Sequence, residues 1–269
     1  MKVLERQTKV YEIVGDNLEM LKVRVGRHPV FAEAGKMVYL RGPVQMESRM
    51  STGKDKGFLG KIVSAGKRVL AGESLFLTFF EGEGEVGFAG DFPGRILPIG
   101  LSQEAILAQK DAFLAAIGEI DLSIALQKRI GGALFGGEGF IVEKLSGDGV
   151  VFIHAGGDLV TFDLAPGETI RVDTGCVVAW DESVSYDVQF VGGIKTALFG
   201  GEGLFLTTLT GPGTVVIQTM TLAKLRRQLQ AAGPREAPES STARTVGLGA
   251  LGAGVGGILG SILGDEDEG

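Results

Sequence analysis

Short apolar runs separated by glycine turns dominate the middle of the chain. From residue 140 to residue 172 the runs are rich in Val, Ile, Phe and Leu, and glycine or proline interrupts them at intervals of about ten residues. This spacing is typical of antiparallel hairpins in a sandwich or a barrel. It predicts strands at 140–145, 150–153, 159–164 and 170–172, with a turn at Pro166-Gly167.

The pattern recurs along the chain at a fixed interval. The string Ala-Leu-Phe-Gly-Gly-Glu-Gly occupies residues 133–139 and returns unchanged at 197–203, 64 residues later. Fixed self-similarity indicates supersecondary units that bury their apolar faces against one another. A glycine turn follows each copy and a third lies upstream; the turn residues are Gly82 and Gly84, Gly147 and Gly149, and Gly211, Pro212 and Gly213.

We therefore expect an all-β core at residues 1–222, built from three tandem sandwich or half-barrel repeats at about 1–90, 91–155 and 156–222. Pro212 and Gly213 are expected to form a type II turn, because proline presets φ at the first central position and glycine supplies φ > 0 at the second. Gly84 and Gly149 are expected at the equivalent place.

Two segments break the β rhythm. Apolar residues between 57 and 70 fall near helical spacing, which fits a short amphipathic helix or an ordered loop. Leu222, Leu225 and Leu229 would line one face of a helix, and a stretch rich in Ala, Pro, Ser and Glu follows. Residues 223–245 are therefore expected to be a short helix and a linker, and 246–269 a separate glycine-rich tail with an acidic end.

Composition and charge narrow the classes of function. The chain has 269 residues, 44 glycines, 8 prolines and a net charge of -7, which argues against a nucleic-acid footprint over the whole surface. Cys176 is the single cysteine, so no internal disulfide can form, and the first residues lack an apolar segment behind a basic end. The expected compartment is the cytoplasm.

Four motifs carry a resemblance to a known family. They lie at residues 155–158, 166–173, 178–184 and 201–216, and the last reads Gly-Glu-Gly-Leu-Phe-Leu-Thr-Thr-Leu-Thr-Gly-Pro-Gly-Thr-Val-Val. From about Leu18 to Met220 the chain resembles the altered-inheritance-of-mitochondria family, member twenty-four type. The resemblance implies a triplicated β fold similar to the tryptophan RNA-binding attenuator protein and a homotrimer, which gives a ring of nine β units. It implies no catalytic residues, and the inner-membrane role of the mitochondrial relatives does not transfer directly, because the chain has no transit segment.

Few residues suggest chemistry. His28 and His154 lie in different repeats without a paired histidine, so we expect structural or surface histidines and no metal, with His154 at a strand end. Cys176 is expected to be a small buried hydrophobe in a strand. The string at 247–252 matches Gly-x-Gly-x-x-Gly but follows a polar linker, so we expect no dinucleotide and no other cofactor.

One basic cluster stands out in this acidic chain. A solvated face is the first interpretation, and an anionic lipid head group or an acidic partner is the alternative. Single-stranded RNA is disfavoured, because only Phe58 lies among the basic residues. The cluster consists of Lys54, Lys56, Lys61, Lys67 and Arg68.

The tail places large apolar residues at spacings of three and four. Glycines recur at the fourth position from Gly252 to Gly264, as in closely packed membrane helices, yet glycine disfavours a helix. Three interpretations stay open: a flexible tail, a membrane-surface or self-association segment, and a membrane span. The apolar residues are Leu248, Leu251, Val255, Ile258 and Ile262.

These observations favour a non-enzymatic, homotrimeric β scaffold. Its tails would be presented to a membrane or to a protein partner, either free in the cytoplasm or at the inner face of the membrane. The alternative is a small-ligand-binding β module with a pocket between repeats or subunits. An enzyme is the weakest reading, because no acid/base or nucleophilic constellation is visible.

Overall fold

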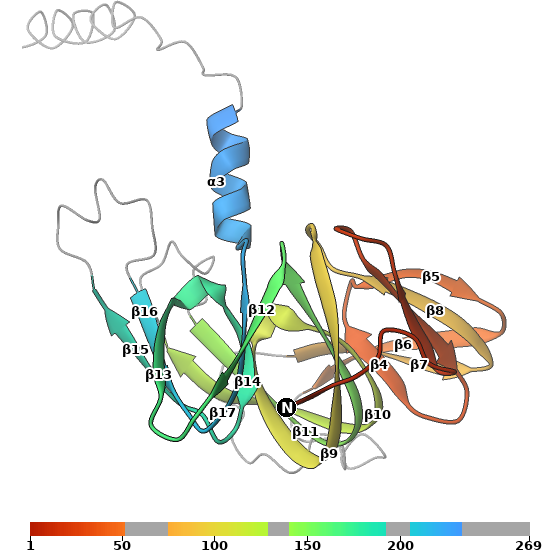
Figure 1. The fold of residues 1–269 in the computed structure, drawn as a ribbon. Coiled ribbons are helices and arrows are strands. Elements are labelled where there is room, and N and C mark those ends of the chain that lie inside the picture. Colours follow the sequence, from red (N-terminus) through yellow and green to blue (C-terminus); the bar gives the residue numbers. More distant parts are fainter. Residues whose placement is uncertain (52–74, 129–139, 192–204, 233–269) are drawn as a thin grey trace, which may run out of the picture. The chain divides into compact units, whose positions relative to one another are not determined.

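Antiparallel strands make up most of the chain in the computed structural model, which describes residues 1–51, 75–128, 140–191 and 205–232 (Figure 1). The basic cluster, the tail and both copies of the seven-residue string lie outside these residues. Met1–Arg226 form one compact unit, called the body below, and Arg227–Gly269 form another. The prediction of a predominantly β core is confirmed.

The strands fall into three consecutive groups. The first group is β3 (Met20–Val25), β4 (Val30–Glu33), β5 (Met37–Arg41), β6 (Val44–Ser51), β7 (Leu75–Gly82) and β8 (Gly84–Ala89), preceded by β1 (Lys2–Val3) and β2 (Tyr11–Val14). The middle group is β9 (Gly94–Gln109), a 3-10 turn η1 (Lys110–Ala112), β10 (Phe113–Lys128) and β11 (Phe140–Gly156). The last group is β12 (Leu159–Leu164), β13 (Thr169–Asp173), η2 (Thr174–Cys176), β14 (Val177–Asp181), β15 (Ser185–Phe190), β16 (Phe205–Thr210) and β17 (Gly213–Gln218), followed by α3 (Leu222–Ala232).

Each group has the same pairing order. In the first group β8 lies between β3 and β5, and β7 lies between β4 and β6. In the last group β17 lies between β12 and β14, and β16 lies between β13 and β15. In the middle group the long strand β11 lies between β9 and β10, and it is paired on both sides from Val142 to Ile153. The middle group thus has three long strands where each of the other two groups has six shorter ones.

Local irregularities recur at matching positions. The turn η1 starts at Lys110 and η2 starts at Thr174, 64 residues later. One extra residue interrupts the register directly after the first residue of β5, of β10 and of β14, at Val38, Leu114 and Val178. Such bulges re-aim a strand without ending it.

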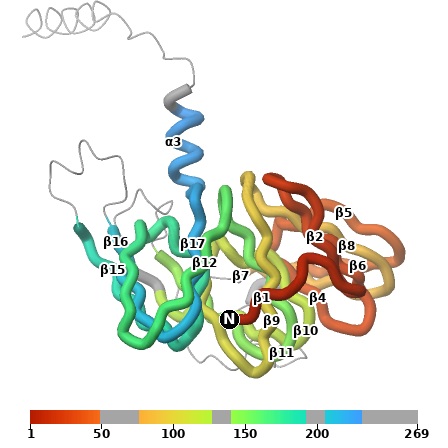
Figure 2. Tube along the Cα trace, in the orientation of Figure 1, coloured from red at the N-terminus to blue at the C-terminus, as the bar shows by residue number. Residues whose placement is uncertain are grey.

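Two junctions join the groups through short strand pairs. At the first junction β4 pairs with β10, and at the second β9 pairs with β14. Apolar side chains from neighbouring groups fill the core on both sides of these pairs, including Phe31, Phe152, Val178 and Trp180. Along the body the first and last groups lie at opposite ends, with β9, β10 and β11 between them (Figure 2).

The predicted elements match the structure unevenly. The strand expected at 159–164 is β12 exactly, and the helix expected from Leu222 is α3, which continues to Ala232. Gly147 and Gly149 do not form a turn, because β11 runs through them and stays paired on both sides. No helix in the described part of the chain is long and apolar enough to cross a membrane.

The expected type II turn is wrong. The peptide bond before Pro212 is cis, which belongs to another turn class. Gly213 and Gly149 do have the expected positive φ, whereas Gly84 lacks it and Gly82 has it instead. Gly84 is needed for space instead, since a Cβ there would lie 2.2 Å from the backbone oxygen of Arg41.

Candidate functional site

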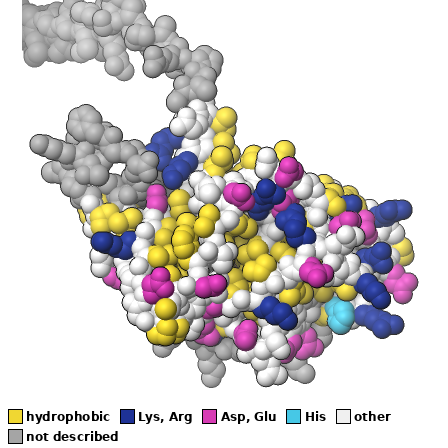
Figure 3. All heavy atoms as spheres, in the orientation of Figure 1, with side chains coloured by type: hydrophobic (Ala, Val, Ile, Leu, Met, Phe, Trp, Pro, Cys, Tyr) yellow, Lys and Arg dark blue, Asp and Glu magenta, His cyan; other side chains and the backbone are white. Residues whose placement is uncertain are grey.

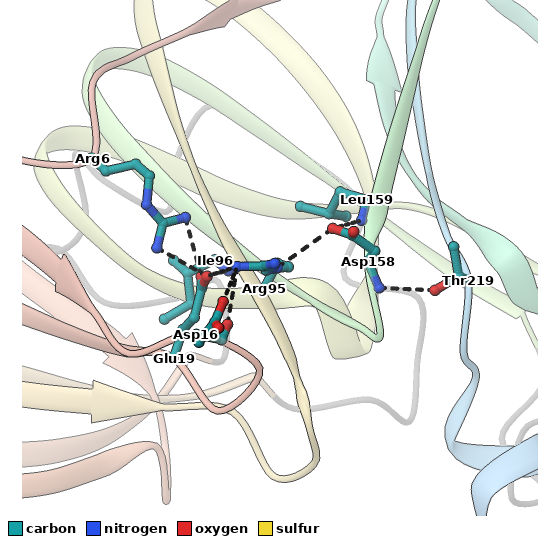
Figure 4. A network of polar contacts seen from close by, with 8 residues as sticks. All are labelled: Arg6, Asp16, Glu19, Arg95, Ile96, Asp158, Leu159 and Thr219. Carbon is teal, nitrogen blue, oxygen red and sulfur yellow. Dashed lines mark hydrogen bonds and ion pairs between the residues drawn. The ribbon is translucent and has the colours of Figure 1, made fainter.

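A buried carboxylate, Glu19, lies at the centre of a polar network (Figure 4). Its side chain is fully buried in the loop before β3. Arg6 Nη2 and Arg95 Nη1 each lie 2.9 Å from its Oε1, and the backbone N–H of Ile96 donates to its Oε2 at 2.7 Å. Three donors compensate its burial, so it is a satisfied ion and not an open binding site.

The Glu19 network connects distant segments of the body. Arg95 Nη1 also donates to the backbone oxygen of Asp16 at 3.0 Å, and its Nε lies 3.4 Å from Asp158 Oδ1. The backbone N–H of Asp158 donates to Thr219 Oγ1 at 2.8 Å. The network thus joins four segments: the N-terminal segment, the start of β9, the turn before β12 and the residue after β17. Its role is therefore structural.

A second buried carboxylate lacks such compensation. Glu143 on β11 is 2% exposed, and its Oε2 has no hydrogen-bond partner. Burial and the nearby charge of Glu33 raise the pKa of Glu143 well above its usual range, while Lys110 acts against them and Asp111 adds to them. The group is therefore held in its neutral form at moderate pH.

The same region continues to the first group through Lys36. Its Nζ lies 2.5 Å from Asp91 Oδ2 and 3.3 Å from Glu33 Oε2. Burial raises the pKa of Glu33 despite that lysine. His154 also belongs to this cluster, where its ring packs against Phe92 near Asp91. Burial and the charge of Lys36 lower the pKa of His154, which favours the neutral imidazole.

Matching positions of the last group carry neutral residues. Thr207 stands 64 residues after Glu143, and its hydroxyl bonds to the hydroxyl of Thr174, which stands 64 residues after Lys110, at 3.0 Å. Gln218 stands 64 residues after His154 and bonds the backbone of Gly156 and Gly175. The last group thus has neutral residues in place of Glu143, Lys110 and His154. Among the described residues no three His, Cys, Asp or Glu side chains are placed to hold a metal ion.

The candidate residues from the sequence do not converge. His154 is buried in β11 and His28 is exposed in the loop before β4. Cys176 is buried as expected, but it ends the turn η2 and is not in a strand; Lys224 Nζ lies 3.7 Å from its Sγ. The predicted turn glycines lie within β11 in the middle group, and where β7 meets β8 and β16 meets β17 in the other two groups. The basic cluster and the apolar tail residues fall outside the described residues.

Apolar residues are exposed at the two ends of the body, which the hydrophobic pattern of the sequence does not predict. Val38 and Leu40 on β5 are 56% and 36% exposed, and Val160 and Phe162 on β12 are 39% and 37% exposed. Hydrophobic side chains also reach the surface over β12 in the space-filling view (Figure 3). Aligning the bulge residues of the three groups would have drawn attention to Val38, because Leu114 and Val178 at the matching places are apolar too.

Comparison with known proteins agrees with this architecture. The family model described as mitochondrial biogenesis AIM24 matches residues 11–220. An uncharacterized protein of Streptococcus pyogenes serotype M6 is 33% identical over 205 residues, which cover 75% of this chain and 81% of that protein. The crystal structure of a Streptococcus pyogenes protein has a TM-score of 0.65 at 24% identity, covering 82% of this chain and 98% of that one, and so shares the fold. The chain therefore belongs to the mitochondrial biogenesis AIM24 family.

Proposed function

We propose that the protein is a non-enzymatic scaffold whose copies join head to tail into a closed ring of three. The three strand groups are taken as three copies of one unit, in line with their common pairing order and their matching bulges. The resemblance to the altered-inheritance-of-mitochondria family, which implies a homotrimer, supplies the number of copies. The contacts between groups supply the mode of association.

The bulge residues carry the proposal. Leu114 and Val178 face the junctions within the chain and are 0% and 1% exposed. Val38 holds the same place in the first group, before which no other group is described, and it is 56% exposed. An apolar residue buried at two junctions and open at the third is what a head-to-tail chain of units leaves at its first end.

The last group leaves a matching face at the other end. Val23, Ile99 and Phe162 each lie opposite a buried valine of the central strand, namely Val86, Val151 and Val215. Val23 and Ile99 are 0% exposed, because a following group covers them, whereas Phe162 is 37% exposed. Joining this face to the first group of another copy would remove both apolar surfaces from water.

Two charge substitutions test the mode of association. We expect Val38→Lys and Phe162→Lys each to give single chains by light scattering, because each places a charge in one half of the joint. An equimolar mixture of the two variants should form a one-to-one dimer, since one intact half remains on each. Thr161→Lys is the matched control: it lies beside Phe162 on β12, and the first group already has Lys22 at that register.

The mixture separates head-to-tail joining from a two-fold symmetric contact. A symmetric contact would pair like with like, so the mixture would behave as each variant does alone. Assembly unaffected by either substitution would contradict the proposal. So would a loss of assembly in the control.

We also propose that the C-terminal segment connects the ring to a membrane surface or a protein partner. The support is its composition, with glycine-spaced apolar residues ahead of four acidic ones. Co-sedimentation with liposomes that is lost on deletion of residues 246–269 would support the membrane arm. Sedimentation unchanged by the deletion would exclude it.

A further inference from the structure

Among the strand edges that have no further neighbour in the described residues, those of β5 and β13 belong to the kinds of strand that join the groups. β5 ends the sheet in which β2, β3 and β8 precede it, and β13 ends the sheet that it forms with β16 and β15. An open edge presents unpaired N–H and C=O groups that can pair with another chain. The two edges lie at opposite ends of the body (Figures 1 and 2), so β13 cannot reach β5 of its own chain.

The two junctions within the chain fix how such edges pair. At the first, Ala32 of β4 lies opposite Ala115 of β10, and the antiparallel pairing continues through Phe31 with Ala116 and Val30 with Ile117. At the second, Ala108 of β9 lies opposite Ala179 of β14, followed by Leu107 with Trp180 and Ile106 with Asp181. Each junction is an antiparallel pair of three residues.

The bulges and central strands show that the register is the same at both junctions. Ala115 and Ala179 are each the first paired residue after the bulge. Ala32 and Ala108 each lie opposite a buried polar residue of the central strand, Thr78 and Glu143. In the open edges Tyr39 is the first paired residue after the bulge of β5, and Val172 of β13 lies opposite the buried Thr207.

We propose, building on the head-to-tail scaffold, that β13 of one copy pairs antiparallel with β5 of the next copy, with Val172 opposite Tyr39, Arg171 opposite Leu40 and Ile170 opposite Arg41. The partner of both edges is a second copy of this chain. This pair makes a third junction from the strands that correspond to those of the two junctions within the chain. In a closed ring it leaves neither the β5 edge nor the β13 edge open.

The side chains of β5 fit this pairing. At the junctions within the chain the residue after the bulge is alanine, whereas β5 has the larger Tyr39. Tyr39 lies over Gly87 of the neighbouring strand, where a Cβ would come within 2.2 Å of its ring, and its hydroxyl donates to Glu85 Oε1 at 2.6 Å. The middle group has the reverse arrangement, with Ala115 opposite Phe152. The tyrosine thus fills the place of that phenylalanine instead of covering the edge.

Charge does not oppose the pairing. Neighbouring residues of a strand point to opposite faces of the sheet, so Arg171 shares a face with Leu40 while Arg41 shares the other face with Ile170. The two guanidinium groups are therefore separated by the sheet. Both arginines and Leu40 are exposed in the single chain, so substituting them disturbs no buried contact of the body.

A disulfide across the joint tests the register. In full-length protein with Cys176→Ala, which matches Ala112 in the middle group, we expect Leu40→Cys combined with Arg171→Cys to link copies under mild oxidation. Directly opposite residues of an antiparallel pair have Cα atoms about 4.5–5.5 Å apart, within the range that a disulfide spans. The linked species on a denaturing gel should extend to the size of the closed ring.

The control displaces one cysteine along the same face. Leu40→Cys with Thr169→Cys is two residues out of register and should link far less, because its Cα atoms are about 7–8 Å apart. If light scattering finds rings but the displaced pair links as well or better, or neither pair links, the register is wrong while the scaffold stands. If light scattering finds single chains before oxidation, the scaffold and the strand pairing both fail.

Discussion

Glu143 is a buried carboxyl group that the body must keep uncharged. Its Oε2 has no partner, and the described groups that act on its charge are Glu33, Asp111 and Lys110. Two of these three are acidic, so ionisation would place a further negative charge in a poorly hydrated place. The neutral pair Thr207 and Thr174 shows that the fold itself does not need a charge there.

We predict that Glu143→Gln stabilises the protein at alkaline pH. In the unfolded chain the carboxyl group of Glu143 loses its proton at about pH 4.3, whereas in the folded chain it keeps the proton to a higher pH. Above pH 4.3 the unfolded state therefore binds fewer protons than the folded state, and stability falls as pH rises until the folded group ionises too. At pH 8 the free energy of unfolding should rise by on the order of 1 kcal/mol in the variant, measured by urea denaturation.

At acidic pH the gain should vanish, because Glu143 is then protonated in both states. Asp121, whose pKa burial raises to about 6, acts equally in both proteins and cancels in the difference. A variant less stable than the parent at pH 8 would show that the ionised carboxylate has a favourable partner.

Single residues could be predicted only where the local sequence determines their role. Burial of Cys176 follows from its small apolar side chain, and His154 at the apolar end of a strand follows from the run before it. Glu143 could not be found in this way, because it stands next to the charged Lys144 and its burial depends on contacts distant in sequence. The exposure of Val38 depends on which group lies next to it, which hydrophobic pattern alone does not contain.

At the scale of elements, the central strands cross their partners at backbone contact. A Cβ at Gly149 of β11 would lie 2.2 Å from the backbone oxygen of Ile117, just as one at Gly84 would lie 2.2 Å from that of Arg41. Glycine at these places lets the strand bend while it stays paired on both sides. In the first group β7 and β8 belong to different sheets, and in the last group β16 and β17 do so too.

Gly149→Val should destabilise the protein by about 1 kcal/mol or more, because the added side chain meets backbone atoms that cannot move independently. Gly26→Val is a suitable control, since no atom lies within 4 Å of its Cβ position and its φ is not positive. Thermal melting of both variants measures the effect. Equal melting temperatures would contradict the role of the bend.

Elements were predictable where turns and alternation agree, as at β12. The sequence could not show whether Gly147 and Gly149 form a turn that ends a strand or lie within a strand that continues. Glycine is needed in either case. The sequence also could not show the cis peptide before Pro212. The 64-residue interval itself is visible in the sequence, because the string at 133–139 returns unchanged at 197–203.

For the whole molecule, the three strand groups, if taken as copies of one unit as proposed above, form an open series with a different unmatched face at each end. Side-chain exposure identifies the faces through Val38 and Phe162, and strand pairing identifies the edges through β5 and β13. These observations are independent of each other, since one concerns side chains and the other the backbone. Both are satisfied by a ring of identical copies, which leaves no end.

The mass of the full-length protein in solution tests this account most directly. Light scattering at micromolar concentration should give about 85 kDa, three times the 28.2 kDa of one chain, and the same number of copies should remain when residues 231–269 are removed. A mass of one chain at that concentration would contradict the ring, and so would assembly that disappears with the tail.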